Sequence, residues 1–411
     1  MKKILLVIIG TLSVISSAKS QDFLGYINSN YSGVTGTDLN PASVVDSRYK
    51  VDISLFGTSF SFYNNYVGMK RSALKHNGKV FAFGDSTNYT AFNDKDFQKN
   101  YLRTRTDAKP KSVYLDNQIY GPSFMMTLNR DNAIAVKWKV RTMVNVDGVE
   151  PDLAAQIYAG LKDSTQWTLK LNNKKLSIQT MSWAEYGVTY GHVFKRDGAN
   201  FFKAGATLKL IQGLQAAYMF VDNLDYNFTN DTTLSLFHTD ISYGHSTNFD
   251  FSDKNNVKYK YISNPAVGLD IGAVYEWRPD FEKFKYDMDG ETGLYRKDKL
   301  KYKLKVGISV VDIGAVKFKK APESHNFSAD INYWDIHNLP VKGVPSFDSI
   351  MKSKFSMEPE PSTFKMNLPT AISTQIDYNI YKDFYANFTF FGALKFNNSI
   401  SISVRTTIVF R

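Results

Sequence analysis

The chain has 411 residues, no cysteine, a formal net charge of +11, and aromatic residues at 15% of the sequence. The absence of cysteine excludes disulfide-stabilised folds, thiolate metal sites and cysteine nucleophiles. Lysine and arginine are spread through strand-like segments rather than gathered in a patch or tail, so we expect no nucleic-acid partner. Contact with anionic lipid head groups is the simpler interpretation of the positive charge.

The first twenty residues have the pattern of a secretory signal peptide. Lys2 and Lys3 precede an apolar stretch from residue 4 to 15, and small residues follow up to Ser20. The apolar run is shorter than the about 20 residues that a membrane-spanning helix needs, which disfavours that alternative. We expect cleavage before Gln21, and loss of the three lysines in residues 1–20 leaves a net charge of +8.

An irregular segment follows at residues 21–48 and precedes the first strand. It holds several glycines and the turn-forming pair Asn40 and Pro41. We expect this segment to fold back as an N-terminal hatch, with Asn40 and Pro41 part of it. The sequence therefore predicts three regions: a signal peptide (1–20), a hatch or periplasmic segment (21–48) and an outer-membrane β-barrel (49–411).

The strongest signal beyond residue 49 is alternation with a period of two, which puts successive side chains on opposite faces of a strand. One face carries apolar residues and is expected to point outward: Val136, Leu208, Leu269, Tyr302, Ile308, Ile376, Ile402 and Phe410 are examples. The other face is polar, and its charged members are the candidate ligand-binding residues: Lys137, Lys139, Arg141, Lys203, Lys209, Asp270, Glu276, Lys303, Lys305 and Arg405. We expect the polar face to be hydrated.

A soluble β-sandwich alternates in the same way, so the pattern leaves two architectures open. Three features favour a membrane. The segments have the about ten residues that a tilted strand needs to cross a bilayer. Aromatic residues such as Trp277 stand at strand ends, and glycines within strands, such as Gly205 and Gly272, suit a curved wall. The sequence predicts an all-β fold, a transmembrane antiparallel barrel of about a dozen strands.

Four long polar connections separate the strands, at residues 64–111, 243–256, 279–299 and 320–366. Short helices are expected at residues 151–161 and, more weakly, at 347–355. The last strand is expected to run without a break from residue 400 to 411.

We find no motif for a catalytic or metal site, and we predict no enzymatic activity, no cofactor and no metal. The polar faces hold more cations than their expected counter-charges, Asp52, Asp270, Glu276 and Asp377. Two interpretations remain open. The cations could form a path or pocket for anionic solutes, or they could pair across the wall and hold a filled interior rigid.

Short sequence phrases along the chain resemble a family of Bacteroidota outer-membrane proteins of unknown function that is related to the FadL and PorV barrels. They are LNPA (39–42), GPSF (121–124), GATLK (205–209), GLDIGAVYE (268–276), GISVVDIG (307–314) and LPTA (368–371). Each phrase is short, and the order and spacing carry the resemblance over most of the chain.

The resemblance implies a FadL-like barrel of about 14 strands with a hatch in its lumen. FadL proteins carry hydrophobic molecules inward, so we expect an outer-membrane protein that admits small hydrophobic or amphipathic anionic molecules. PorV-like members serve type IX secretion as a shuttle or scaffold, which is the first alternative; a soluble secreted β-protein is the second. The expected partners are outer-membrane lipids or lipopolysaccharide, and proteins of an envelope complex.

Overall fold

The computed structural model describes residues 27, 31–70, 72, 95–196, 198–247, 265–296, 299–337, 344–358, 361–382, 384–394 and 400–410. The expected signal peptide and most of residues 21–30 lie outside these ranges. The fold is all-β: one sheet of sixteen strands and two sheets of two strands. Pairing is antiparallel except between β16 (Thr363–Asn367) and β19 (Ile400–Ser401). No helix in the described part of the chain is long and apolar enough to cross a membrane.

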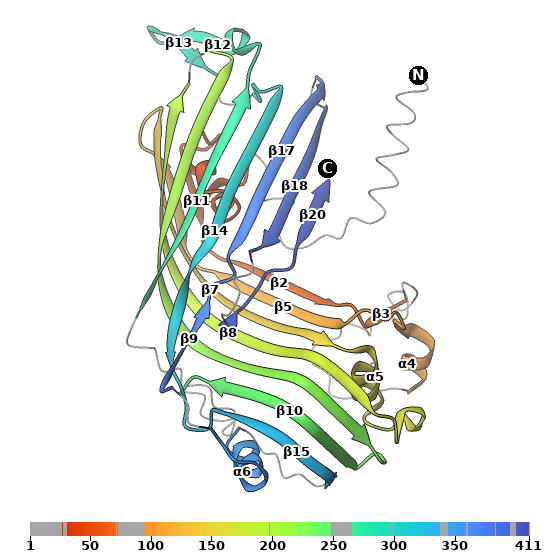
Figure 1. The fold of residues 1–411 in the computed structure, drawn as a ribbon. Coiled ribbons are helices and arrows are strands. Elements are labelled where there is room, and N and C mark those ends of the chain that lie inside the picture. Colours follow the sequence, from red (N-terminus) through yellow and green to blue (C-terminus); the bar gives the residue numbers. More distant parts are fainter. Residues whose placement is uncertain are drawn as a thin grey trace.

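Three long strands form the centre of the large sheet: β7 (Asn132–Val149), β8 (Leu171–Lys195) and β9 (Asn200–Phe228). On both sides of them the sheet divides into two limbs (Figure 1). The upper limb adds β1 (Val51–Ser54), β6 (Ser123–Thr127), β11 (Ala266–Trp277), β14 (Leu304–Lys319), β17 (Ala371–Tyr381), β18 (Phe384–Ala393) and β20 (Thr407–Phe410). The lower limb adds β2 (Gly57–Asn64), β5 (Lys111–Tyr120), β10 (Thr233–His245) and β15 (His325–Asp335).

Smaller elements complete the fold. They are β3 (Val67–Met69), β4 (Leu102–Thr104), α4 (Lys95–Tyr101), α5 (Pro151–Ala159), η5 (Ser164–Gln166), η6 (Phe281–Phe284), β12 (Lys285–Met288), β13 (Glu291–Tyr295) and α6 (Val344–Lys354). The expected helices at 151–161 and 347–355 are confirmed by α5 and α6. The hatch contains two short 3-10 helices, η1 (Gly33–Asp38) and η2 (Pro41–Val44). Proline at the first position of η2 starts that helix, and the Asn40 side chain accepts from the Ala42 N–H to cap it.

The limbs separate at two bulges. On β9, Leu214 is an extra residue, because Trp183 lies opposite Gly213 while Ser182 lies opposite Gln215. On β14, Asp312 lies at a register shift and has a left-handed backbone, with φ of 57°. A bulge bends its strand and increases the local twist. Beyond Gly314, β14 leaves β11 and pairs with β16 instead.

The upper limb has apolar side chains outside and charged side chains inside. Leu208 is 61% exposed, whereas the next residue, Lys209, is 3% exposed. Val136, Val188 and Ile308 are exposed in the same way as Leu208. The outward face assigned from the alternation is therefore confirmed at Val136, Leu208 and Ile308. The polar face is buried rather than hydrated, because acids from other elements and the hatch cover it.

In β10 and β15 of the lower limb the arrangement is reversed. Phe327 of β15 and Tyr243 of β10 are buried in a cluster that also contains Met351 and Phe355 from α6 and its end. Polar side chains such as Ser328 and Asp330 on the other face of β15 are exposed. A helix therefore covers the apolar face here, as in a water-soluble α+β layer.

An inner apolar cluster fills the space where the limbs divide. Met181, Trp183 and Ile211 from the long strands pack there against Val316 and Phe318 of β14, with β16 side chains and Ile402. The second half of β14 thus lies over the inner face of the long strands. It forms a short second layer with β16.

Four expectations about the strands are corrected. The sheet has sixteen strands, more than the about 12 to 14 expected. Residues 320–366 are not only a connection, because they contain β15. Residues 400–410 are not one strand: β19 pairs with β16, β20 pairs with β18, and Ile402 between them is buried. Tyr302 is buried rather than outward, because β14 begins only at Leu304.

The strand pairing of the described residues does not close into a ring. Within the described residues β20 pairs only with β18, and β1 pairs only with β6. The segment just before β20 comes near β2, since the Arg405 guanidinium lies 3.6 Å from the centre of the Tyr63 ring.

Candidate functional site

The hatch lies on the concave side of the sheet, behind β11 and β14 in Figure 1. Its seat is a row of glycines in register: Gly191 of β8 lies opposite Gly205 of β9, which lies opposite Gly272 of β11. A Cβ atom at Gly205 would come within 2.7 Å of the Pro41 backbone. Backbone contact this close requires glycine. The strand glycines therefore make room for the hatch, in addition to any role in curvature.

Asn40 connects the hatch to several strands at once. Its Nδ2 donates to the carbonyls of Ala273 and Ile308, at 3.2 and 3.3 Å, and to Oε1 of Gln375 at 3.2 Å. Asn40 is 3% exposed, so these bonds are shielded from water. Asn40 and Pro41, the two residues singled out from the sequence, are thus among the points at which the hatch contacts the wall.

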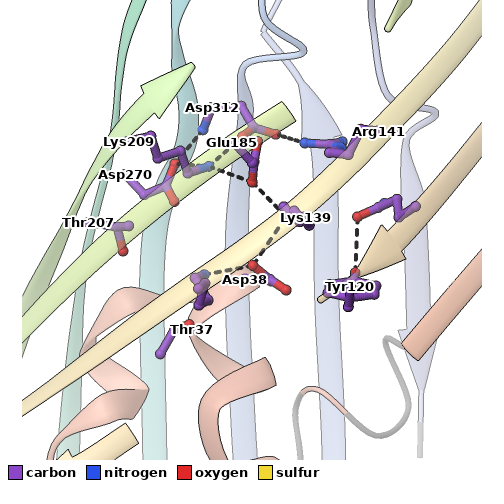
Figure 2. Close-up of polar contacts among 12 residues, drawn as sticks. Thr37, Asp38, Tyr120, Lys139, Arg141, Glu185, Thr207, Lys209, Asp270 and Asp312 are labelled. Carbon is purple, nitrogen blue, oxygen red and sulfur yellow. Dashed lines mark hydrogen bonds and ion pairs between the residues drawn. The ribbon is translucent and has the colours of Figure 1, made fainter. Parts of the chain in front are cut away.

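Asp38 joins the hatch to the charged face of β7 (Figure 2). Its Oδ1 lies 2.7 Å from Nζ of Lys137 and 3.2 Å from Nζ of Lys139. Lys139 also pairs with Glu185 of β8 at 3.0 Å. Burial raises the pKa of the Asp38 carboxyl, but the Lys137 and Lys139 charges outweigh burial and hold the pKa well below its usual range. Asp38 is therefore an anion in the folded protein.

The same ion-pair network continues to Asp312 at the bulge of β14. Asp312 accepts from Arg141 and from Lys209, both at 2.6 Å, and Lys209 also pairs with Asp270 at 2.8 Å. The Asp312 N–H donates to Oδ1 of Asp270. Aspartate tolerates the left-handed backbone better than most residues, and this conformation turns its carboxylate into the network.

The network holds four cations and five carboxylates. The cations are Lys137, Lys139, Arg141 and Lys209, and the carboxylates are Asp38, Asp116, Glu185, Asp270 and Asp312. The sequence led us to expect an excess of cations here, and the structure has one more carboxylate than cations. Sequence reasoning named only Asp270 among these acids. The D-I-G phrase shared by residues 270–272 and 312–314 was the available signal for Asp312.

A second ionic cluster holds the end of the hatch at the turn between β8 and β9. Asp46 pairs with Arg196 at 3.0 Å and with Arg278 at 3.1 Å, and Arg278 also pairs with Glu276 at 2.6 Å. Lys203 Nζ donates to the Val45 carbonyl at 2.5 Å. Burial raises the pKa of the Asp46 carboxyl, but the Arg278 and Lys203 charges outweigh burial and hold the pKa well below its usual range. Lys203 and Glu276 thus anchor the hatch.

The remaining predicted site residues lie apart from the network. Lys303 is not in the interior: its Nζ lies 5.1 Å from the ring of Tyr378, whose side chain is exposed on the outer face. The alternation fails here for the same reason as at Tyr302, because both residues precede the first paired residue of β14. Lys305 lies beside the Tyr302 ring, and Arg405 lies on Tyr63.

Two small cavities flank the hatch, each of about 90 Å³. One is lined by Lys203, Glu276 and Lys305, and the other by Arg141, Lys209 and Arg405. Ligand pockets for drug-sized molecules are about 300 to 1,000 Å³, so these cavities have room for waters or a small ion only.

The described residues contain no group of three or more histidine, aspartate or glutamate side chains placed to hold a metal ion. Each carboxylate of the network already faces a lysine or arginine. The arrangement buries and neutralises fixed charge between the hatch and the wall.

Comparison with known proteins identifies the family. A family model for proteins of unknown function, DUF5723, matches residues 41–409. No curated protein matches the sequence, and no solved structure matches the chain. The family match begins at Pro41 in the hatch and covers the described strands up to the last residue but one of β20, so the protein belongs to this family of unknown function, DUF5723.

Proposed function

We propose that the protein is integral to the outer membrane of a Gram-negative cell and that its upper limb forms the wall of a FadL-like barrel around the hatch. One observation carries the proposal: the upper limb is inverted relative to a water-soluble protein. Val188, Leu208 and Ile308 are exposed on its outer face, and charged side chains are buried on its inner face. A continuous apolar surface of this kind matches the lipid-facing band of a barrel.

The turns supply the orientation in this proposal. Three short connections lie at one end of the strands, at residues 128–131, 196–199 and 382–383, and the longer connection 278–303 with β12 and β13 lies at the same end. Outer-membrane barrels have short turns on the periplasmic side and long loops outside. The hatch then enters from the periplasm, and the lower limb with α5 and α6 projects from the outer surface. Tyr275, Trp277 and Tyr378 form an exposed aromatic belt near the turn end.

Substitution on the outer face tests the membrane location. Leu208→Lys and Ile308→Lys should each cost about 2 to 4 kcal/mol near the middle of a bilayer. The measurement is the yield of folded protein in outer-membrane fractions, read from the change in gel mobility on boiling. Ser328→Lys, on an exposed polar position of β15, is the matched control and should assemble normally. Normal assembly of the Leu208 and Ile308 variants, or extraction without detergent, would favour the soluble secreted alternative.

Within the membrane, the interior favours a closed scaffold for an envelope complex. The hatch is held at Asp38, Asn40 and Asp46, and the cavities beside it are too small for passage. The scaffold predicts no conductance in planar bilayers and co-purification of partner proteins from native membranes. Steady conductance of the wild-type protein, or its recovery without partners, would contradict it.

Admission of small amphipathic anions, as the resemblance to FadL proteins implies, is the second candidate. It is favoured by the cavity at the turn end, which is lined by six cations and two carboxylates. This route requires the hatch to move. Uptake of a fluorescent fatty acid that depends on the protein would support it, and equal uptake without the protein would rule it out.

A further inference from the structure

A larger cleft lies at the turn end of the upper limb, beside the interior cavity. Its volume is about 540 Å³, within the range of ligand sites. We call it the rim cleft; the residues that line it and carry charge are Arg48, Lys299, Lys301, Lys303, Lys382 and Asp280. Five cations thus line the cleft with one carboxylate, and three of them (Arg48, Lys299 and Lys301) also line the interior cavity that contains Asp46 and Glu276. Cations outnumber carboxylates in the rim cleft, whereas carboxylates outnumber cations in the ion-pair network inside. This excess of positive charge makes the rim cleft a site for an anionic group.

The rim cleft meets the exposed apolar face of the sheet. Lys303 Nζ lies 5.1 Å from the centre of the Tyr378 ring and 3.4 Å from the Ile380 carbonyl. Lys382 Nζ lies 5.3 Å from the Tyr381 ring. Both rings are exposed, at 44% and 67%. A cation on an aromatic face keeps its charged end at the border between water and an apolar surface.

This border limits the kind of anion that fits. A soluble anion would use only the cations, and an acidic peptide would not need an apolar surface that continues along the strands. A lipid phosphate uses both, because its charge lies at the interface and its chains lie beside the wall. The about 540 Å³ cleft can hold a phosphate with a small head group.

We propose that the rim cleft binds the phosphate of an anionic phospholipid, with Lys303 and Lys382 holding the head group and with the acyl chains along Tyr378, Tyr381 and Phe384. The inference rests on the proposed membrane location. It adds to that proposal a defined lipid site at one end of the wall, where the strand pair β17–β18 turns.

Binding to the detergent-purified full chain tests the site. The probes are short-chain phosphatidylglycerol, short-chain phosphatidylcholine and inorganic phosphate, measured by thermophoresis or native mass spectrometry. We expect phosphatidylglycerol to bind more tightly than either of the other probes. The double variant Lys303→Gln/Lys382→Gln should weaken phosphatidylglycerol binding about thirtyfold, which corresponds to on the order of 1 kcal/mol for each of the two lysines. Lys174→Gln/Lys175→Gln, two exposed lysines at the far end of β8, should leave it unchanged.

Each other outcome overturns the proposal. Equal binding of phosphatidylcholine would remove the selectivity for anionic lipid. Phosphate binding as tight as phosphatidylglycerol would assign the cleft to a soluble anion. An unchanged affinity in the Lys303/Lys382 variant would place the lipid elsewhere. In all three cases the assembly test at Leu208 and Ile308 still decides the membrane location separately.

Discussion

Leu208 and Lys209 are neighbours on β9, and Phe327 and Ser328 are neighbours on β15. The two pairs differ in which residue, the apolar or the polar one, is exposed. In the upper limb the leucine is exposed and the lysine is buried. In the lower limb the phenylalanine is buried and the serine is exposed. Both pairs obey the same alternation. The difference lies in what covers each face.

The apolar face of β10 and β15 is covered by α6, with α5 beside it. In the described residues no helix covers the outer face at Leu208 or Ile308, and this is the face that we assign to lipid. In water, an apolar sheet face needs a covering layer such as a helix. In a bilayer, lipid makes the apolar contact with that face instead. The long strands run through both limbs and change neighbours on the way: β9 pairs with β11 up to Ile211 and with β10 from Ala217.

The largest effect should come from removing the charge at the centre of the ion-pair network. Asp312→Asn keeps the size of the side chain and a residue that tolerates a left-handed backbone, but it leaves Arg141 and Lys209 short of a carboxylate. Breaking a buried pair in this way costs about 3 to 5 kcal/mol. Thermal unfolding in detergent measures the loss. Asp330→Asn on the exposed face of β15 is the control, and equal losses for both variants would mean that the network adds no stability.

Truncation of Phe355, at the end of α6 in the lower limb, should have the next largest effect. Phe355 stacks on Phe327 with ring centres 5.0 Å apart. Phe355→Ala should cost about 3 kcal/mol because it leaves a cavity in protein. Leu208→Ala should cost far less, because lipid closes around a smaller outward side chain. Urea unfolding in bilayers compares the two, and similar costs would remove the distinction between a face covered by protein and a face covered by lipid.

A smaller effect is expected at the seat of the hatch. Gly205→Val puts a side chain where the Pro41 backbone lies, and overpacking of this kind costs about 1 to 3 kcal/mol. The hatch should then become sensitive to protease, and the protein should conduct in planar bilayers if the hatch is what closes it. Ala206→Val, one residue along on the outer face, should change neither property. A protected hatch in the Gly205 variant would show that its close approach is not required.

The smallest effect is expected from acid. Asp38 and Asp46 have lowered pKa values in the folded protein, since the surrounding cations outweigh burial. Their contribution to hatch binding is therefore present above the ordinary aspartate pKa of 3.8 and is lost only as the pH falls towards their lower values. The hatch should resist protease equally at about pH 7.5 and about pH 5. Release between these values would mean that another group controls it.

Local pattern was enough to assign most faces of the strands. Alternation has a period of two wherever a residue is paired in a ladder, so the outward position of Leu208 and the inward position of Lys209 follow from the sequence. The same rule fails at Tyr302, Lys303 and Ile402, which lie just outside the paired segments. Where a strand begins and ends depends on its neighbours, and this information is not local.

The sequence by itself determined an all-β chain with one apolar and one charged face on its long strands, and it marked Asn40 and Pro41 as part of a hatch. Only the tertiary structure decided that the charged face is buried, because its partners Asp38 and Asp312 come from segments about 100 residues or more away in the chain. The division of the sheet into two limbs and the row of glycines beneath the hatch were likewise decided by the tertiary structure. Each depends on the register in which distant strands pair, and the local sequence does not specify which distant residue lies opposite a given side chain.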